Sequence, residues 1–285
     1  MEIEFASDAI SVEIDGHVGT LWLDSPERRN AMGAALWNDL PLAIDVLNTD
    51  PLVRVIVIAA KGKSFTVGLD LKDSFLAQGA AGSQLTDGGS IPSPSQAAQF
   101  IARRKEIKRL QDSISSVANT NKPTISYIHG HCIGGGIDLI SACDIRVASP
   151  DAIFSIRETK MAIVADLGTL QRLPRIIGLG RMNELAFTGK DFDATFAKEI
   201  GLVNYIGVDY EDGLAITRQL ANEIAQNSPL VVSGTKAVLR ASLESTIEDG
   251  LDYVANWNAG ALLSDDLMEA VSSFLEKRLP NFRGN

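Results

Sequence analysis

Three short runs of apolar and β-branched residues constrain the fold of this chain more than any other feature. They occupy residues 53–60, 124–129 and 145–148. Their length and composition are typical of strands buried on both faces, and the stretches between them are long enough to hold helical crossovers. The alternation of buried strands and helices predicts an α/β fold.

The chain opens with a second β signal. Residues 10–14 alternate in polarity, Asp15-Gly16 follows as a turn, and residues 18–23 resume the strand pattern. Asp-Gly between two such runs favours a hairpin, because the turn needs residues that tolerate positive φ. We therefore expect a hairpin at the start of the fold.

A helical pattern follows, with Leu36, Leu40, Ile44 and Leu47 on one face. Pro41 stands inside it, and we expect this proline to kink or interrupt the helix because it has no N–H to donate.

Residues 78–95 are rich in Gly, Ser and Pro, which predicts a surface loop leading into a long amphipathic helix. From about residue 196 the pattern is mainly helical, so we divide the chain into a core, residues 1–195, and a helical C-terminal region, residues 196–285.

Charge and composition exclude several classes of function. A net charge of −10 and a pI near 4.8 argue against nucleic-acid binding, which requires a basic surface. No apolar run is long enough to span a bilayer, so no membrane segment is expected. The first eight residues include the acidic Glu2, Glu4 and Asp8 where a presequence would be basic, which predicts a cytoplasmic protein. Cys132 and Cys143 have no paired spacing, so neither a disulfide framework nor a metal site is expected.

The most informative motif is a glycine triplet. Gly134, Gly135 and Gly136 follow a strand pattern and open a helical one. Glycines let a ligand approach the main chain closely, and unpaired N–H groups at a helix start can stabilise a developing negative charge. The alternative is a tight strand-to-helix turn that holds no ligand.

A second glycine-bearing stretch, residues 61–71, also follows a buried strand and contains Gly68. It could supply another main-chain N–H donor. Neither stretch has the spacing of a nucleotide-binding loop or of a dinucleotide-binding fingerprint, which disfavours nucleotide hydrolysis and hydride transfer.

The two stretches together resemble the crotonase (enoyl-CoA hydratase/isomerase) family, and the resemblance extends from about residue 10 to 270. It implies a spiral ββα core, an acyl-CoA thioester substrate and an oxyanion hole whose donors are the N–H groups of Leu69 and Gly135. It further implies that the helical C-terminal region assembles homotrimers or homohexamers. Coenzyme A would be part of the substrate, with no separate cofactor and no metal. The substrate-binding residues that it implies are Gly68, Leu69, Asp70, Leu71, Lys72 and Gly136.

Three carboxylates refine the resemblance: Asp138, Glu158 and Asp166. Hydratases of the family have glutamates at the first two positions and glycine at the third, whereas the Δ3,5-Δ2,4-dienoyl-CoA isomerases have Asp, Glu and Asp. The resemblance therefore implies isomerisation of 3,5-dienoyl-CoA to 2,4-dienoyl-CoA in fatty acid β-oxidation. Proton transfer between C2 and C6 needs two carboxyls with separated pKa values, for which Glu158 and Asp166 are candidates.

Two alternatives remain open. An enoyl-CoA hydratase would use Asp138 and Glu158 around a water molecule and leave Asp166 idle. A non-catalytic or RNA-binding protein on the same scaffold is disfavoured by the acidic pI. The residues do not assign which of Glu158 and Asp166 takes the C2 proton, and they leave the acyl-chain length open.

Overall fold

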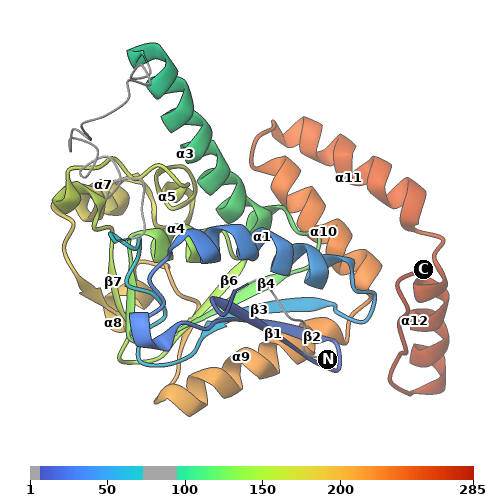
Figure 1. The fold of residues 1–285 in the computed structure, drawn as a ribbon. Helices are drawn as coiled ribbons and strands as arrows, with labels where there is room; N and C mark the ends of the chain where they lie inside the picture. Colours follow the sequence, from blue (N-terminus) through green and yellow to red (C-terminus); the bar gives the residue numbers. More distant parts are fainter. Residues whose placement is uncertain (1–6, 73–94) are drawn as a thin grey trace.

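The protein is described here by a computed structural model, which defines residues 7–72 and 95–285. Its main sheet has the strand order β1-β2-β3-β4-β6-β9. β1 and β2 pair antiparallel, and every other neighbouring pair is parallel (Figure 1). The strands are β1 (Ile10–Asp15), β2 (Val18–Leu23), β3 (Val55–Ala60), β4 (Thr124–Ile128), β6 (Ile145–Ala148) and β9 (Tyr205–Ile206). The predicted hairpin, the three buried strands and the α/β class are thus confirmed.

β3 shows why the apolar runs are continuous rather than alternating. Ile56 and Ile58 face one hydrophobic cluster together with residues of α1 (Ala34–Thr49) and α3 (Gln96–Asn119). Val55 and Val57 face a second cluster, which includes Leu214 of α9 (Tyr210–Ala225). Helices therefore cover the two faces of the sheet, and both faces of the strand are buried.

A second, smaller sheet was not predicted. It has the order β5-β7-β8 and consists of β5 (His131–Ile133), β7 (Ile153–Ser155) and β8 (Phe192–Asp193). These strands have only three, three and two residues, which is too short for a period-two pattern to be recognised in sequence. An isolated bridge between Thr66 and Cys132 connects the loop after β3 to β5.

α1 differs from its prediction in one respect. The face with Leu36, Leu40, Ile44 and Leu47 is buried as expected, but the helix continues through Pro41. Tertiary packing of this apolar face outweighs the hydrogen bond that the proline removes.

The remaining helices fall into two groups. Short ones surround the second sheet: η1 (Pro26–Arg28), α4 (Gly135–Ser141), η2 (Glu158–Met161), α5 (Thr169–Arg172), α6 (Pro174–Ile177), α7 (Leu179–Thr188) and α8 (Ala194–Glu199). The C-terminal ones are α10 (Pro229–Ser242), α11 (Ile247–Ala261) and α12 (Asp265–Glu276). α11 packs on α10, and α11 and α12 extend away from the sheet (Figure 1).

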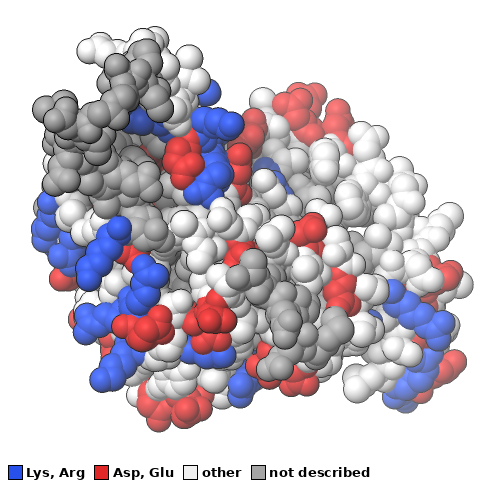
Figure 2. Space-filling model, viewed as in Figure 1, with Lys and Arg blue, Asp and Glu red and all other residues white. Residues whose placement is uncertain are grey.

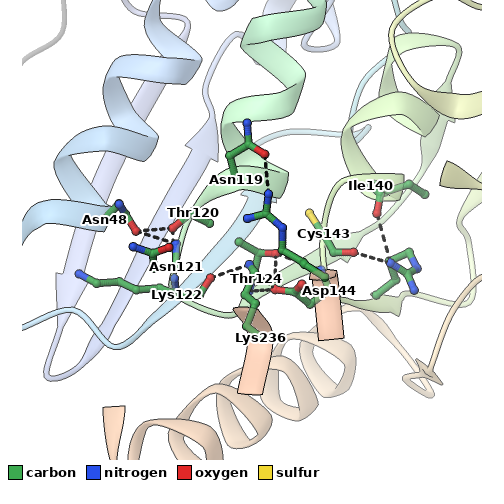
Figure 3. Close-up of polar contacts among 12 residues, drawn as sticks. Asn48, Asn119, Thr120, Asn121, Lys122, Thr124, Ile140, Cys143, Asp144 and Lys236 are labelled. Atoms are coloured by element: carbon green, nitrogen blue, oxygen red, sulfur yellow. Dashed lines mark hydrogen bonds and ion pairs between the residues drawn. The ribbon is translucent and has the colours of Figure 1, made fainter. Parts of the chain in front are cut away.

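Lys236 attaches α10 to the sheet. Its Nζ donates to Asp144 Oδ2 at 2.7 Å and to the carbonyl of Lys122 at 2.8 Å (Figure 3). Asp144 Oδ2 also accepts hydrogen bonds from the N–H and the hydroxyl of Thr124, at the start of β4. Asp144 therefore has a structural role.

Two predictions concern the loop over residues 78–95 and the division of the chain after residue 195. The loop over residues 78–95 lies, apart from residue 95, outside the described residues. The division at residues 195 and 196 stays a prediction, with β9 and α9 beyond it packed on the core. In the part of the chain that the structure describes, no helix combines the length and apolarity that crossing a membrane requires.

Candidate active site

The glycine triplet lies where β5 ends and α4 begins. Gly134 has φ +53°, a conformation that L side chains rarely adopt, and its N–H donates to the carbonyl of Ser155 at 2.9 Å. A Cβ on Gly134 would lie 3.3 Å from Glu158 Oε1. The triplet thus opens α4 directly beside a carboxylate.

The second glycine stretch meets the triplet in space. Gly68 has φ +86°, and a Cβ there would lie 2.8 Å from the carbonyl oxygen of Ile133 and 3.7 Å from the nitrogen of Gly135. Within the described ranges, the N–H groups of Leu69 and Gly135 donate no hydrogen bond. Two unpaired donors that sequence reasoning selected separately therefore lie close together.

Asn30 fixes the loop that carries Leu69. Its Nδ2 donates to the carbonyls of Lys61 and Ser64 at 2.9 and 2.8 Å, and its side chain is buried. The Thr66 hydroxyl donates to the Asn30 carbonyl at 2.5 Å and accepts from the N–H of Gly68 at 3.1 Å. This network holds the main chain at Gly68 without using the N–H of Leu69.

Asp138 projects from α4 and is almost completely buried, with 1% of its surface exposed. Its Oδ1 accepts hydrogen bonds from the N–H and the hydroxyl of Thr169, both at 2.7 Å. Burial raises the pKa of Asp138 to about 7, the bonds from Thr169 oppose the rise, and the charges of Glu158 and Asp166 add to it. At neutral pH this carboxyl exists in both protonation states.

Glu158 and Asp166 complete the cluster. Burial raises the pKa of Glu158, and the Asp166 charge raises it further, while burial also raises the pKa of Asp166. Glu158 Oε2 is buried and has no hydrogen-bond partner among the described residues. An unpartnered buried carboxylate oxygen is costly for folding and is therefore a candidate for contact with a ligand.

Asp166 also borders an open space. Together with Leu167 and Gly168 it forms part of the wall of a cavity of about 840 Å³ between α3, α4, α5 and α10. The structure thus brings the three candidate carboxylates into electrostatic range of one another, with Glu158 beside the glycine triplet and Asp166 beside the cavity.

The other predicted binding residues differ in their surroundings. Gly136 packs against Thr66, since a Cβ there would lie 2.6 Å from Thr66 Cγ2. Asp70 is buried and forms an ion pair with Arg28, and Leu71 is 52% exposed. Lys72 is exposed, and its N–H donates to Asp70 Oδ1 at 2.9 Å. Asp70, Leu71 and Lys72 lie on the same loop as Leu69, with Leu71 and Lys72 at its surface.

Sequence reasoning missed three residues that hold the carboxylates: Gln111, Thr169 and Arg172. Thr169 and Arg172 follow Asp166 by three and six residues, and this proximity in sequence was a signal. Gln111 gave no signal, because it lies on α3, 55 residues from Asp166 in sequence.

The histidines stay outside this cluster. His129 is buried, its Nε2 lies 2.9 Å from the carbonyl of Gly62, and burial lowers its pKa. His131 is exposed. Across residues 7–72 and 95–285, no group of three or more His, Cys, Asp and Glu side chains is placed to hold a metal ion.

Comparison with known proteins places this site in a family. The family model described as "Enoyl-CoA hydratase/isomerase" matches residues 13–285. The chain belongs to the enoyl-CoA hydratase/isomerase family. One relative, 44% identical over 94% of this chain and 88% of its own length, is named mitochondrial Δ(3,5)-Δ(2,4)-dienoyl-CoA isomerase of Dictyostelium discoideum. Another, 42% identical over 99% of this chain and 98% of its own, is the peroxisomal enzyme of that name from Arabidopsis thaliana.

A solved structure agrees with the fold of this family member. An enoyl-CoA hydratase from Bacillus anthracis superimposes with a TM-score of 0.85 at 29% identity, and the match covers 97% of this chain and 100% of that one. The expected crotonase-like core with a helical C-terminal region is therefore confirmed.

The relatives correct one prediction. Their names place them in mitochondria and peroxisomes, which contradicts the expected cytoplasmic location. That prediction rested on the charge of eight N-terminal residues. Compartment is not a property of the folded core, since targeting signals are short segments read by receptors.

Proposed function

We propose that this family member is a Δ3,5-Δ2,4-dienoyl-CoA isomerase that acts in fatty acid β-oxidation. The observation that carries the proposal is the third carboxylate, Asp166, within electrostatic range of Asp138 and Glu158. The names of the relatives with 44% and 42% identity support it. Coenzyme A is part of the substrate, and the reaction needs no separate cofactor or metal.

The N–H groups of Leu69 and Gly135 bind the thioester oxygen. Removal of a proton from C2 places negative charge on that oxygen, and a fixed donor that faces it lowers the barrier by about 3 to 4 kcal/mol. The support is the closeness of the two donors, with the Cβ position of Gly68 lying 3.7 Å from the nitrogen of Gly135. The loop from Gly68 to Lys72, together with Gly136, binds the remainder of the thioester and the pantetheine.

The position of each carboxylate suggests its role. Glu158 Oε1 lies beside Gly134, and therefore beside the oxyanion site and C2. Asp166 lies at the wall of a cavity that neither Glu158 nor the glycine triplet lines, and we assign it to the C6 end of the acyl chain. Glu158 takes the C2 proton, the double bonds shift from C3 and C5 to C2 and C4, and Asp166 delivers a proton to C6.

Protonation of the cluster fits this scheme. A proton donor at C6 must hold its proton near neutral pH, and burial raises the pKa of all three carboxyls. Asp138 does not reach the substrate in this proposal. The charges of Glu158 and Asp166 disfavour its ionisation, and so Asp138 keeps a proton in the cluster.

The hydratase alternative uses the same site differently. It needs Asp138 and Glu158 to hold a water molecule, whereas Asp138 is buried and its Oδ1 is occupied by Thr169. The RNA-binding alternative requires a basic surface. On the face shown in Figure 2, acidic and basic side chains are interspersed, and the chain carries a net charge of −10.

The deciding experiment is a spectrophotometric assay on 3,5-octadienoyl-CoA and, separately, on crotonyl-CoA, with wild type and Asp166→Asn. We expect growth of the conjugated 2,4-dienoyl absorbance with wild type and a loss of at least about 100-fold in the variant. Rapid hydration of crotonyl-CoA that is insensitive to Asp166→Asn would instead establish a hydratase.

The C-terminal helices assemble this protein as a homotrimer, or as a homohexamer of two trimers. An apolar cavity of about 610 Å³ lies between α10, α11 and α12, and Trp257 and Leu262 are among the residues that line it. Leu263 and Phe274 expose 94% and 82% of their surfaces. Such an apolar surface is typical of an interface between subunits.

A further inference from the structure

The loop that carries Asp166 is held from a helix distant in sequence. Gln111, on α3, donates from Nε2 to the carbonyl oxygen of Asp166 at 2.6 Å. Lys108 Nζ donates to the Oε1 of the same amide at 3.0 Å. With an ammonium bound to its oxygen, the amide of Gln111 must present its NH₂ group to Asp166.

Arg172 holds the next residue of the loop. Its Nη1 donates to the carbonyl of Leu167 at 3.2 Å, and its Nη2 donates to Ser115 Oγ at 3.0 Å. Gln111 and Ser115 are four residues apart on α3 and therefore lie on the same face of the helix. One face of α3 thus contacts the Asp166 loop twice, once directly and once through Arg172.

Gly168 makes room for this arrangement. Its φ is +127°, and a Cβ at this position would overlap the guanidinium of Arg172. The guanidinium therefore packs against the main chain of the loop, where only glycine leaves space. Gln111 therefore binds the carbonyl of Asp166, and Arg172 binds the carbonyl of Leu167. Gly168, the next residue, leaves the space that the guanidinium needs.

We propose that Gln111 and Arg172 are positioning residues that hold Asp166 at the distance from C6 that proton delivery requires. The inference rests on the proposed function, because it assumes that Asp166 acts at C6. Neither residue touches the reacting atoms. They act by fixing the main chain at Asp166 and Leu167, and a displacement of about 1 Å at a catalytic group can reduce the rate about 100-fold.

This role predicts an effect on one half of the reaction only. Proton removal at C2 uses Glu158, which η2 and the glycine triplet position without help from Gln111 or Arg172. Loss of the two positioning side chains should therefore slow proton delivery to C6 and leave exchange at C2 intact. A residue that only stabilised the fold would not separate the two steps.

The experiment uses the full-length enzyme with Gln111→Leu, Arg172→Met and Arg172→Lys. Arg218→Gln is the matched control, because Arg218 is exposed on α9, away from the cavity, and its side chain hydrogen-bonds to none of the described residues. Turnover of 3,5-octadienoyl-CoA gives kcat and KM. Exchange of the C2 proton of 3-octenoyl-CoA in D2O, followed by mass spectrometry, reports the first step alone, because this substrate has no double bond at C5.

We expect kcat to fall about 10-fold to 100-fold in Gln111→Leu and Arg172→Met, with KM and C2 exchange unchanged. Arg172→Lys should recover part of the loss, since an ammonium can still donate to Leu167. Arg218→Gln should behave as wild type. If kcat and C2 exchange fall together, or if kcat does not change, the inference is wrong. If wild type fails to isomerise the dienoyl substrate, the proposed function itself is wrong, and the inference fails with it.

Discussion

Asp138 shows how a single residue contributes to the site at the expense of stability. It is 1% exposed, and among the described residues it is the two hydrogen bonds from Thr169 to its Oδ1 that compensate for the loss of water around its carboxylate. A raised pKa in the folded state means that the folded protein binds more protons than the unfolded chain between the two pKa values. Stability should therefore fall as pH rises through that interval.

We predict that Asp138→Asn stabilises the protein in a pH-dependent way. The pKa of Asp138 is about 7 in the folded state and 3.8 in the unfolded chain. Ionisation of Asp138 therefore does not change the free energy of unfolding below about pH 4, and it lowers that free energy by its full amount above about pH 7. That full amount is about 4 kcal/mol. Asparagine keeps the oxygen that Thr169 binds but does not ionise.

Urea unfolding of wild type and Asp138→Asn at pH 5 and pH 8 measures this effect. The excess stability of the variant should be larger at pH 8 than at pH 5. Asp45→Asn, at an exposed site on α1, is the control and should give equal differences at both values. A constant difference for Asp138→Asn would mean that Asp138 is ionised throughout this range.

Alanine substitutions at Gly68 and Gly16 test the role of the Leu69 N–H. Both have positive φ, +86° and +56°, so alanine at either position should cost about 1 kcal/mol of stability. Only at Gly68 does the added Cβ meet a backbone atom, the carbonyl oxygen of Ile133 at 2.8 Å. We expect Gly68→Ala to lose isomerase activity at least about 100-fold, because it displaces the N–H of Leu69.

Gly16→Ala, in the β1–β2 turn, has no atom within 4 Å of the added Cβ and should keep full activity. Assays of both variants with 3,5-octadienoyl-CoA, together with thermal unfolding, separate the backbone cost from the catalytic one. Equal activity in the two variants would argue against Leu69 as an oxyanion donor.

At the scale of elements, α1 shows tertiary packing overriding a local signal. Pro41 cannot donate to the carbonyl of Trp37, yet the helix extends from Ala34 to Thr49 without a break. Its apolar face packs against the sheet and α3, which decides the helix even though a proline in a helix interior costs about 3 kcal/mol.

Replacement of this proline should therefore stabilise the protein. We predict that Pro41→Ala raises the free energy of unfolding by about 1 to 3 kcal/mol. Leu42→Ala, at a neighbouring position that is 57% exposed, should change it by less than about 1 kcal/mol. Urea denaturation of both variants measures the difference, and a destabilised Pro41→Ala would show that the ring itself is needed for packing.

At the scale of the whole molecule, many of the exposed apolar side chains lie on α11 and α12, which extend away from the sheet. Leu251 on α11 and Phe274 on α12 expose 63% and 82% of their surfaces. We predict that wild type elutes with the mass of a trimer or hexamer of the 30.5 kDa chain, and that the double variant Leu251→Asp/Phe274→Asp elutes as smaller species. Light scattering after size-exclusion chromatography gives the mass.

Val208→Ser provides the control for this measurement. Val208 is 83% exposed and precedes α9, away from the C-terminal helices, so its variant should keep the wild-type mass. A monomeric wild type would contradict the proposed assembly.

The sequence by itself determined the elements that contain a long, repeated pattern. The runs at 53–60, 124–129 and 145–148 became β3, β4 and β6, because a strand buried on both faces must be apolar throughout. The sequence also selected both glycine stretches, since a main-chain donor beside a close ligand requires glycine. The three carboxylates were selected by the resemblance to the crotonase family.

Tertiary structure alone decided what lies between those elements. The strands of the second sheet are too short to have a period, so only pairing in space defines them. The closeness of Leu69 and Gly135 depends on the contact between Gly68 and Ile133, which lie in segments far apart in the chain. Gln111 and Arg172 reach the Asp166 loop from two different helices, and such contacts depend on how the helices pack, which no local pattern records.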